Sequence, residues 1–138
     1  MITDEHVIEY KKGHVLFKEG DGTKDLYIIQ TGIVKIYKES SGGAVLPIAL
    51  VHSGQFVGEL SFFDGHPRSA TAEAATDIKV IKLDQTKLEK EIKKLPSWLL
   101  VLIRSIATRM READELVKRN SIVDGKMKSE FSRWDSGD

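Results

Sequence analysis

The residues best suited to chemistry lie in one stretch, from Phe56 to Ala74. Gly58 is followed directly by Glu59, and the stretch later reaches Arg68 and Ser69. A glycine lets a ligand approach the backbone closely, and an arginine offers a planar fork that matches a phosphate bidentately. The serine adds a hydroxyl and a backbone N–H beside that fork. This combination predicts a local site for a phosphate-bearing anion.

The segment Glu59 to Phe63 is predicted to form a single helical turn after the glycine. The first N–H groups of a helical turn have no partner within it and attract anions. Glu59 would repel a phosphate, so it fits this site if it binds a sugar hydroxyl while orienting Arg68. The alternative is an ordinary ion pair between Glu59 and Arg68 that closes a surface hairpin, which is common for such pairs.

Several elements must position this stretch, and they differ before and after Thr86. From about Val7 to Leu83, glycines separate short β-branched and aromatic runs. Short strands with turn signals every eight to twelve residues are typical of a β-sandwich or barrel. The runs that we predict as strands are His14–Phe17, Leu26–Gln30, Ile33–Tyr37, Val45–Val51 and Ile78–Leu83.

Beyond Thr86 glycine almost disappears and helical patterns begin. Asp84 is suited to cap a short helix at Lys87–Lys93, and Pro96 then ends this helix. A long helix is predicted from about Trp98 to Asn120, with an apolar stripe at steps of three and four residues. The stripe consists of Leu99, Leu102, Ile103, Ile106, Met110, Ala113 and Val117. It could pack on the sandwich, form a parallel dimer with a second copy, or do both.

The length of 138 residues fits one domain, which we place at 1–120 with the long helix from about 98. Residues 121–138 are predicted to be a short tail with a candidate terminal helix. Phe131 and Trp134 recur there at helical spacing, and we favour simple packing on the sandwich over an aromatic lid on a ligand.

Composition excludes several classes of protein and of site. Lys plus Arg number 21 and Asp plus Glu number 21, so a general electrostatic grip on nucleic acid or anionic lipid is not expected. The absence of cysteine excludes disulfides, thiolate zinc sites and a cysteine nucleophile. The four histidines are scattered, so we predict no metal site. No targeting or membrane segment is visible, which makes a cytoplasmic protein the expectation.

The whole stretch resembles the phosphate-binding cassette of the cyclic nucleotide-binding domain family. The matching residues are Gly58, Glu59, Leu60, Ser61, Phe62, Phe63, Pro67, Arg68, Ser69, Ala70 and Ala74. The runs Lys12–Asp21, Leu26–Ile29 and Gly32–Ile36 are similar to the early strands and glycine turns of that family. The resemblance covers roughly Tyr10 to Asn120, with the first strand near Tyr10 and the N-terminal helical element shortened.

The resemblance implies a mainly β fold with flanking helices: an eight-stranded jelly roll followed by the long C-terminal helix. It implies that Glu59 takes the ribose 2′-hydroxyl and that Arg68 neutralises the cyclic phosphate. Gly58, Ser69 and the backbone N–H groups of three further residues would complete the cradle: Leu60, Ser61 and Ala70.

Two features depart from catabolite-activator-like members of that family. No helix-turn-helix module follows the long helix, so an output domain or protein is expected outside this chain. Base contacts in such activators come from polar residues midway along the long helix, where this sequence has Arg111 and Asp114 as candidates and lacks the hydroxyl residues.

The expected function is regulation rather than catalysis, because no nucleophile–base pair and no metal-activated water is indicated. The domain would bind cyclic AMP first and cyclic GMP second, with no other cofactor, and signal by moving the long helix. A homodimer through that helix is expected, without direct nucleic-acid or membrane contact. The alternatives are a ligand-free dimerisation module of the same fold and a sensor of a cyclic dinucleotide.

Overall fold

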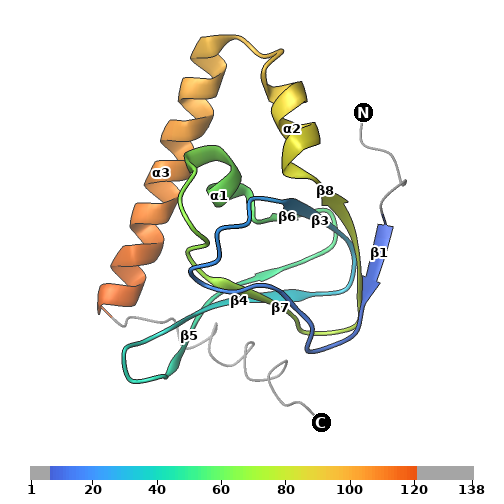
Figure 1. The fold of residues 1–138 in the computed structure, drawn as a ribbon. Helices are drawn as coiled ribbons and strands as arrows, with labels where there is room; N and C mark the ends of the chain where they lie inside the picture. Colours follow the sequence, from blue (N-terminus) through green and yellow to red (C-terminus); the bar gives the residue numbers. More distant parts are fainter. Residues whose placement is uncertain (1–6, 121–138) are drawn as a thin grey trace.

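The computed structural model describes residues 7–120, which form two sheets and three helices (Figure 1). The strands are β1 (Val7–Tyr10), β2 (Val15–Phe17), β3 (Leu26–Thr31), β4 (Val34–Glu39), β5 (Val45–Val51), β6 (Phe56–Val57), β7 (Thr71–Ala74) and β8 (Ile78–Leu83). The helices are α1 (Glu59–Asp64), α2 (Gln85–Ile92) and α3 (Ser97–Asn120). The predicted tail at 121–138, with Phe131 and Trp134, lies outside the described residues.

Each sheet contains four antiparallel strands, in the orders β1-β8-β3-β6 and β2-β7-β4-β5. Strands distant in sequence are therefore neighbours in space, as β1 and β8 or β2 and β7 are. Two such sheets joined by long crossovers make a jelly roll. The predicted fold class, mainly β with flanking helices and a long C-terminal helix, is confirmed.

The core lies between the two sheets and holds the cassette in place. Ile29, Val34, Ala72 and Val80 have no measurable exposure (0%), so alternate positions on β3, β4, β7 and β8 face inward. Their burial removes apolar surface from water, which is the main favourable contribution to folding. β7 forms the last part of the cassette, so this packing fixes the position of the chain directly after Ala70.

The predicted strands agree closely with the observed ones. The strands at Val45–Val51 and Ile78–Leu83 have the predicted bounds, and the three others differ by one or two residues at one or both ends. The start of the roll differs, because β1 begins at Val7 rather than near Tyr10. Val7 pairs with Ile81 of β8, and these cross-strand pairs bring the segment into the sheet.

Glycine and aspartate residues set the limits of the two short helices. α1 lies between Gly58 and Gly65, whose φ angles of 95° and 75° are both left-handed. α2 begins after Asp84, whose side chain accepts a hydrogen bond from the Thr86 N–H at 2.8 Å, which confirms the predicted cap.

The long helix α3 lies along one side of the roll and contacts α1 (Figure 1). Ala107 is buried on its inner face, whereas its outer face carries large exposed apolar side chains. These are Trp98, Val101, Leu102, Ile106 and Leu116. Within residues 7–120, no helix is both long and apolar enough to cross a membrane.

Candidate functional site

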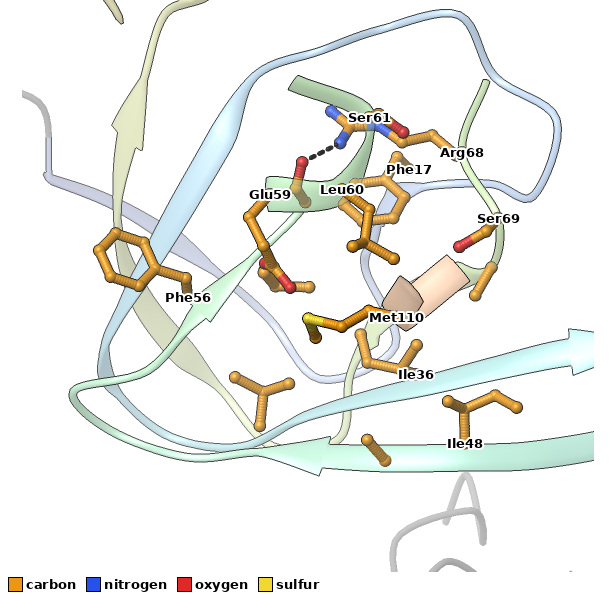
Figure 2. A pocket seen from close by; sticks show the side chains of 15 residues that line it. Phe17, Ile36, Ile48, Phe56, Glu59, Leu60, Ser61, Arg68, Ser69 and Met110 are labelled. Carbon is orange, nitrogen blue, oxygen red and sulfur yellow. Dashed lines mark hydrogen bonds between the residues drawn. The ribbon is translucent and has the colours of Figure 1, made fainter. Parts of the chain in front are cut away.

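The cassette opens onto a pocket enclosed by α1, the sheet of β4 and β5, and α3 (Figure 2). All seven residues that the sequence assigns to ligand binding line this pocket: Gly58, Glu59, Leu60, Ser61, Arg68, Ser69 and Ala70. The jelly-roll topology brings these two short segments to one place. Their contact with a ligand stays a prediction.

Gly58 is required at its position for two separate reasons. Its φ of 95° lies in the left-handed region, which side chains with a Cβ rarely adopt. A Cβ on Gly58 would also lie 2.8 Å from Arg68 Nη1 and 2.8 Å from the Asp25 carbonyl oxygen. The missing side chain therefore leaves the space that the guanidinium of Arg68 occupies.

The guanidinium of Arg68 is held in place by neutral oxygens. Nη1 donates to the Gly58 carbonyl at 2.9 Å, and Nη2 donates to the Asp25 carbonyl at 2.7 Å. Nε donates to the Thr23 hydroxyl at 3.3 Å. A guanidinium has five N–H donors, so within the described part of the chain one donor on each terminal nitrogen is left for a ligand.

The surroundings of Arg68 are mostly dry. The residue is 3% exposed, and its guanidinium carbon lies 4.0 Å from the centre of the Phe17 ring, a cation–π contact. Burial lowers the pKa of Arg68 from its ordinary value, while the nearby Tyr27 and Asp25 act in the opposite direction. The group stays charged, because an arginine in a protein does not lose its proton near neutral pH.

This geometry adds to one sequence expectation and disfavours an alternative. The sequence assigned the orientation of Arg68 to Glu59, and the structure adds hydrogen bonds from Arg68 to Gly58, Asp25 and Thr23. The Glu59 charge raises the pKa of Arg68, but its effect is smaller than the effects of Tyr27 and Asp25 on the same pKa. A buried arginine held by carbonyls is also unlike a surface ion pair that closes a hairpin.

The other end of the pocket is apolar and was missed by the sequence analysis. Figure 2 shows Arg68 with Phe17 at one end, and Met110 with Ile36 and Ile48 at the other. The lining residues that were not predicted are Phe17, Ile36, Ile48, Ala49, Val51, Phe56, Val57 and Met110. The available signal was strand pairing, since antiparallel β4 and β5 place Ile36 opposite Ala49.

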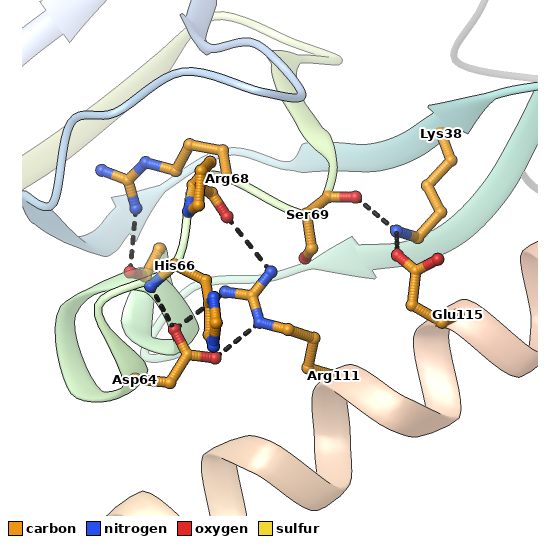
Figure 3. Close-up of polar contacts among 9 residues, drawn as sticks. Lys38, Asp64, His66, Arg68, Ser69, Arg111 and Glu115 are labelled. Carbon is orange, nitrogen blue, oxygen red and sulfur yellow. Dashed lines mark hydrogen bonds and ion pairs between the residues drawn. The ribbon is translucent and has the colours of Figure 1, made fainter.

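Arg111, one of the two candidate base contacts on α3, is not among the described residues that line the pocket. Arg111 instead forms an ion pair with Asp64, at the end of α1, and donates to the Pro67 carbonyl (Figure 3). Asp114 lies in α3, but its side chain is outside what the structure describes. A base contact by either residue stays a prediction.

Metal ligands do not gather in the part of the chain that the structure describes. Within residues 7–120, no group of three or more His, Asp or Glu side chains is placed to hold an ion. His66 lies beside the cassette, where its backbone N–H donates to the Asp64 carboxylate at 2.9 Å.

Comparison with known proteins gives a consistent set of matches. The sequence profile of the family described as "Cyclic nucleotide-binding domain" matches residues 7–94. A "CRP-like cAMP-activated global transcriptional regulator" of Mycobacterium tuberculosis is 31% identical over 107 residues, which are 78% of this chain and 48% of that protein. The "cAMP-dependent protein kinase regulatory subunit" of Dictyostelium discoideum is 37% identical over 75 residues, or 54% of this chain and 23% of that protein.

Solved structures agree with the sequence matches. The crystal structure of the Thermus thermophilus catabolite activator protein aligns with a TM-score of 0.67 at 30% identity, covering 84% of this chain and 55% of that one. The chain thus spans about half of the length of the bacterial relative from Mycobacterium, 48%, and less of the kinase subunit, 23%.

Proposed function

The chain belongs to the cyclic nucleotide-binding domain family, and on that premise we propose that it senses cyclic AMP, with cyclic GMP as the second candidate. The observation that supports this most is the pocket itself. It joins Gly58, Arg68 and Ser69 to an apolar end at Met110 within one cavity. A cyclic nucleotide has the matching form, with an anion at one end and an aromatic base at the other.

In this proposal the polar end takes the phosphate and the sugar. Arg68 donates its remaining N–H groups to the cyclic phosphate, and Ser69 adds its hydroxyl. Glu59 accepts a hydrogen bond from the ribose 2′-hydroxyl. The backbone N–H groups of three residues complete the cradle: Leu60, Ser61 and Ala70.

The base would lie at the apolar end, beside Met110, Ile36 and Ile48. Burying a polar group without a hydrogen-bond partner costs free energy, and guanine has more polar edge groups than adenine. This favours cyclic AMP, in line with the names of the relatives, which refer to cAMP. The Ser69 hydroxyl is the feature that suits cyclic GMP.

We infer that the domain regulates rather than catalyses, and that α3 transmits the signal. Met110 lines the pocket from α3, so an occupied and an empty pocket favour different positions of this helix. The exposed apolar face of α3, with Trp98, Leu102 and Ile106, would pair with a second copy of the chain. An output domain or protein outside these residues would then respond to the helix.

Titration calorimetry tests the proposal with cyclic AMP, cyclic GMP and cyclic di-GMP. Linear 5′-AMP is the matched control ligand, because it has the same base and sugar but an open phosphate. We expect the tightest binding for cyclic AMP, weaker binding for cyclic GMP and little heat with 5′-AMP.

Two results would contradict this reading. No heat with any of the three ligands would favour the alternative of a ligand-free dimerisation module, which sedimentation would then detect as a dimer. Heat with cyclic di-GMP alone would favour the alternative of a cyclic dinucleotide sensor.

A further inference from the structure

Arg111 attaches α3 to the cassette through a buried, two-point ion pair (Figure 3). Its Nε lies 2.5 Å from Asp64 Oδ2, and its Nη2 lies 3.0 Å from Asp64 Oδ1. The side chain of Asp64 is 5% exposed and that of Arg111 is 17% exposed. A buried ion pair with two parallel hydrogen bonds is stronger and more directional than an ion pair on the surface.

The same arginine also reaches the segment around Arg68. Nη1 of Arg111 donates to the carbonyl of Pro67 at 3.1 Å, and Pro67 directly precedes Arg68. The carbonyl of Ser69, which directly follows Arg68, accepts a hydrogen bond from Lys38. Both carbonyls that flank Arg68 are therefore held by cationic side chains.

A second ion pair, one helical turn along α3, completes the arrangement. Glu115 Oε1 lies 3.0 Å from Nζ of Lys38, whose side chain is fully buried at 0% exposure. Residues four apart on a helix lie on the same face, so Arg111 and Glu115 approach the cassette together. α3 thus connects to both sides of Arg68, directly through Arg111 and indirectly through Glu115 and Lys38.

Apolar packing fixes the rotation of α3 only in part, through half-buried Leu99, Leu100 and Ile103 and through Ala107. Among its described side chains, Ala107 is the one classed as buried, whereas Leu102 and Ile106 are each 49% exposed. The polar attachments therefore add to this packing in setting the orientation of the helix. Met110, which lines the pocket and is 47% exposed, directly precedes Arg111, so a change in the Arg111 attachment would also move Met110.

We propose that Arg111 is a positioning residue that clamps Met110 over the pocket through its ion pair with Asp64. This rests on the proposed function for the identity of the ligand, but the clamp itself is a property of the protein alone. Its role differs from direct base contact, because Arg111 acts through the position of α3. Among variants of one binding site, affinity changes arise mostly in the dissociation rate, so loss of this ion pair should act mainly there.

Stopped-flow displacement of a fluorescent cyclic AMP analogue from the full chain measures this effect. We expect Arg111→Gln to raise the dissociation rate about tenfold and to change the association rate less than about twofold. Arg109→Gln is the matched control, because Arg109 is exposed on the same helix and the substitution removes the same charge. Arg111→Lys should give an intermediate rate, because lysine retains the charge but not the two-point contact.

A double-mutant cycle separates the ion pair from general damage. Asp64→Asn should raise the dissociation rate like Arg111→Gln, and the double variant should be no faster than either single variant. Additive effects, or an equal effect of Arg109→Gln, would overturn the clamp.

Hydrogen exchange in the ligand-free chain tests the clamp without any nucleotide. Arg111→Gln should speed amide exchange in the middle of α3, whereas Arg109→Gln should not. Equal exchange in the two variants would refute the clamp even if cyclic AMP binds. If the parent chain binds no nucleotide while Arg111→Gln still loosens α3, the proposed function fails and the clamp stands.

Discussion

The polar and apolar ends of the pocket are built in opposite ways. The polar end comes from two short segments, Gly58–Ser61 and Arg68–Ala70, that are joined by the rest of α1 and by residues 65–67. The apolar end combines β4, β5 and α3, with Ile36, Ile48 and Met110 brought together by the fold. The first is thus a local motif, and the second exists only after the chain has folded.

The difference between the two ends suggests that affinity depends mainly on the polar end and selectivity mainly on the apolar end. In the proposed function, charged hydrogen bonds at the polar end would act on the cyclic phosphate, which every candidate mononucleotide carries. Contacts at the apolar end would act on the base, which distinguishes one ligand from another. A change at the polar end should therefore weaken all cyclic mononucleotides alike, and a change at the apolar end should alter their ratio.

The largest effect is expected for Arg68→Ala, which removes the charge from the polar end. Two charge-assisted hydrogen bonds contribute about 3 kcal/mol together, so calorimetry should show affinity falling about 100-fold for cyclic AMP and cyclic GMP alike. The carbonyls of Gly58 and Asp25 would also lose a donor. We therefore expect the fold to persist with about 2 kcal/mol less stability.

Arg68→Lys is the matched variant, because it keeps the charge but lacks the planar fork. It should recover part of the affinity and lie between the parent and Arg68→Ala. If Arg68→Ala bound cyclic AMP as tightly as the parent, the polar end would be wrongly assigned.

Gly58→Ala tests whether the space beside Arg68 is essential. Its Cβ would meet Arg68 Nη1 and the Asp25 carbonyl at 2.8 Å each, in addition to the left-handed backbone. We expect about 3 kcal/mol of lost stability in urea unfolding and a clear loss of affinity. Gly65→Ala is the control, because Gly65 also has a positive φ of 75° but open space around its Cβ position. Equal losses in the two variants would mean that the backbone strain alone matters.

A smaller effect is expected at the apolar end for Met110→Ala. Loss of its contact with the base should weaken cyclic AMP by about 1 kcal/mol, or roughly fivefold, and change the ratio of cyclic AMP to cyclic GMP affinity. Ile106→Ala is the control, since Ile106 lies one turn earlier on α3 but does not line the pocket. If the ratio stayed constant in Met110→Ala, base selection would not occur at this end.

The smallest effect concerns Tyr27, which lies in the core beneath the polar end. Burial raises the pKa of Tyr27 from 10.0 to about 12. The unfolded chain therefore releases this proton first as the pH rises above 10, and the folded state loses stability until about pH 12. Urea unfolding at pH 8 and pH 11 should show a loss of about 1 kcal/mol from this group. The loss of stability between pH 8 and pH 11 should be smaller in Tyr27→Phe than in the parent. The same pH dependence in both proteins would contradict a raised pKa for a buried Tyr27.

Sequence reasoning succeeded where a local pattern has a local meaning. Gly58 and Arg68 are close enough in sequence to be assigned to one site, and both line the observed pocket, while their roles toward a ligand stay predictions. The strands at Val45–Val51 and Ile78–Leu83 follow from β-branched runs between turn residues. The cap at Asp84 follows from the hydrogen-bonding preference of one side chain.

It failed where the partner lies far away in the sequence. The residues that orient Arg68 include Thr23 and Asp25, in the loop between β2 and β3, and no local pattern marks them. The pairing of Arg111 with Asp64 depends on how α3 crosses α1, which helical periodicity does not specify. Periodicity did identify the stripe that includes Met110, but not the cavity that this side chain would line.

Arg68 is a buried cation whose hydrogen bonds go to carbonyl and hydroxyl oxygens, and the Asp25 carboxylate bonds elsewhere, to Gln85 and Lys82. A buried charge is costly to fold around until an opposite charge joins it. If a cyclic phosphate binds there, it adds an anion that hydrogen-bonds directly to the guanidinium, in addition to the nearby charges of Asp25 and Glu59. Binding then stabilises the folded state by mass action, and cellular turnover tracks the unfolded fraction. Empty copies of the domain would be degraded sooner than occupied ones, so the abundance of the protein would follow the level of its ligand.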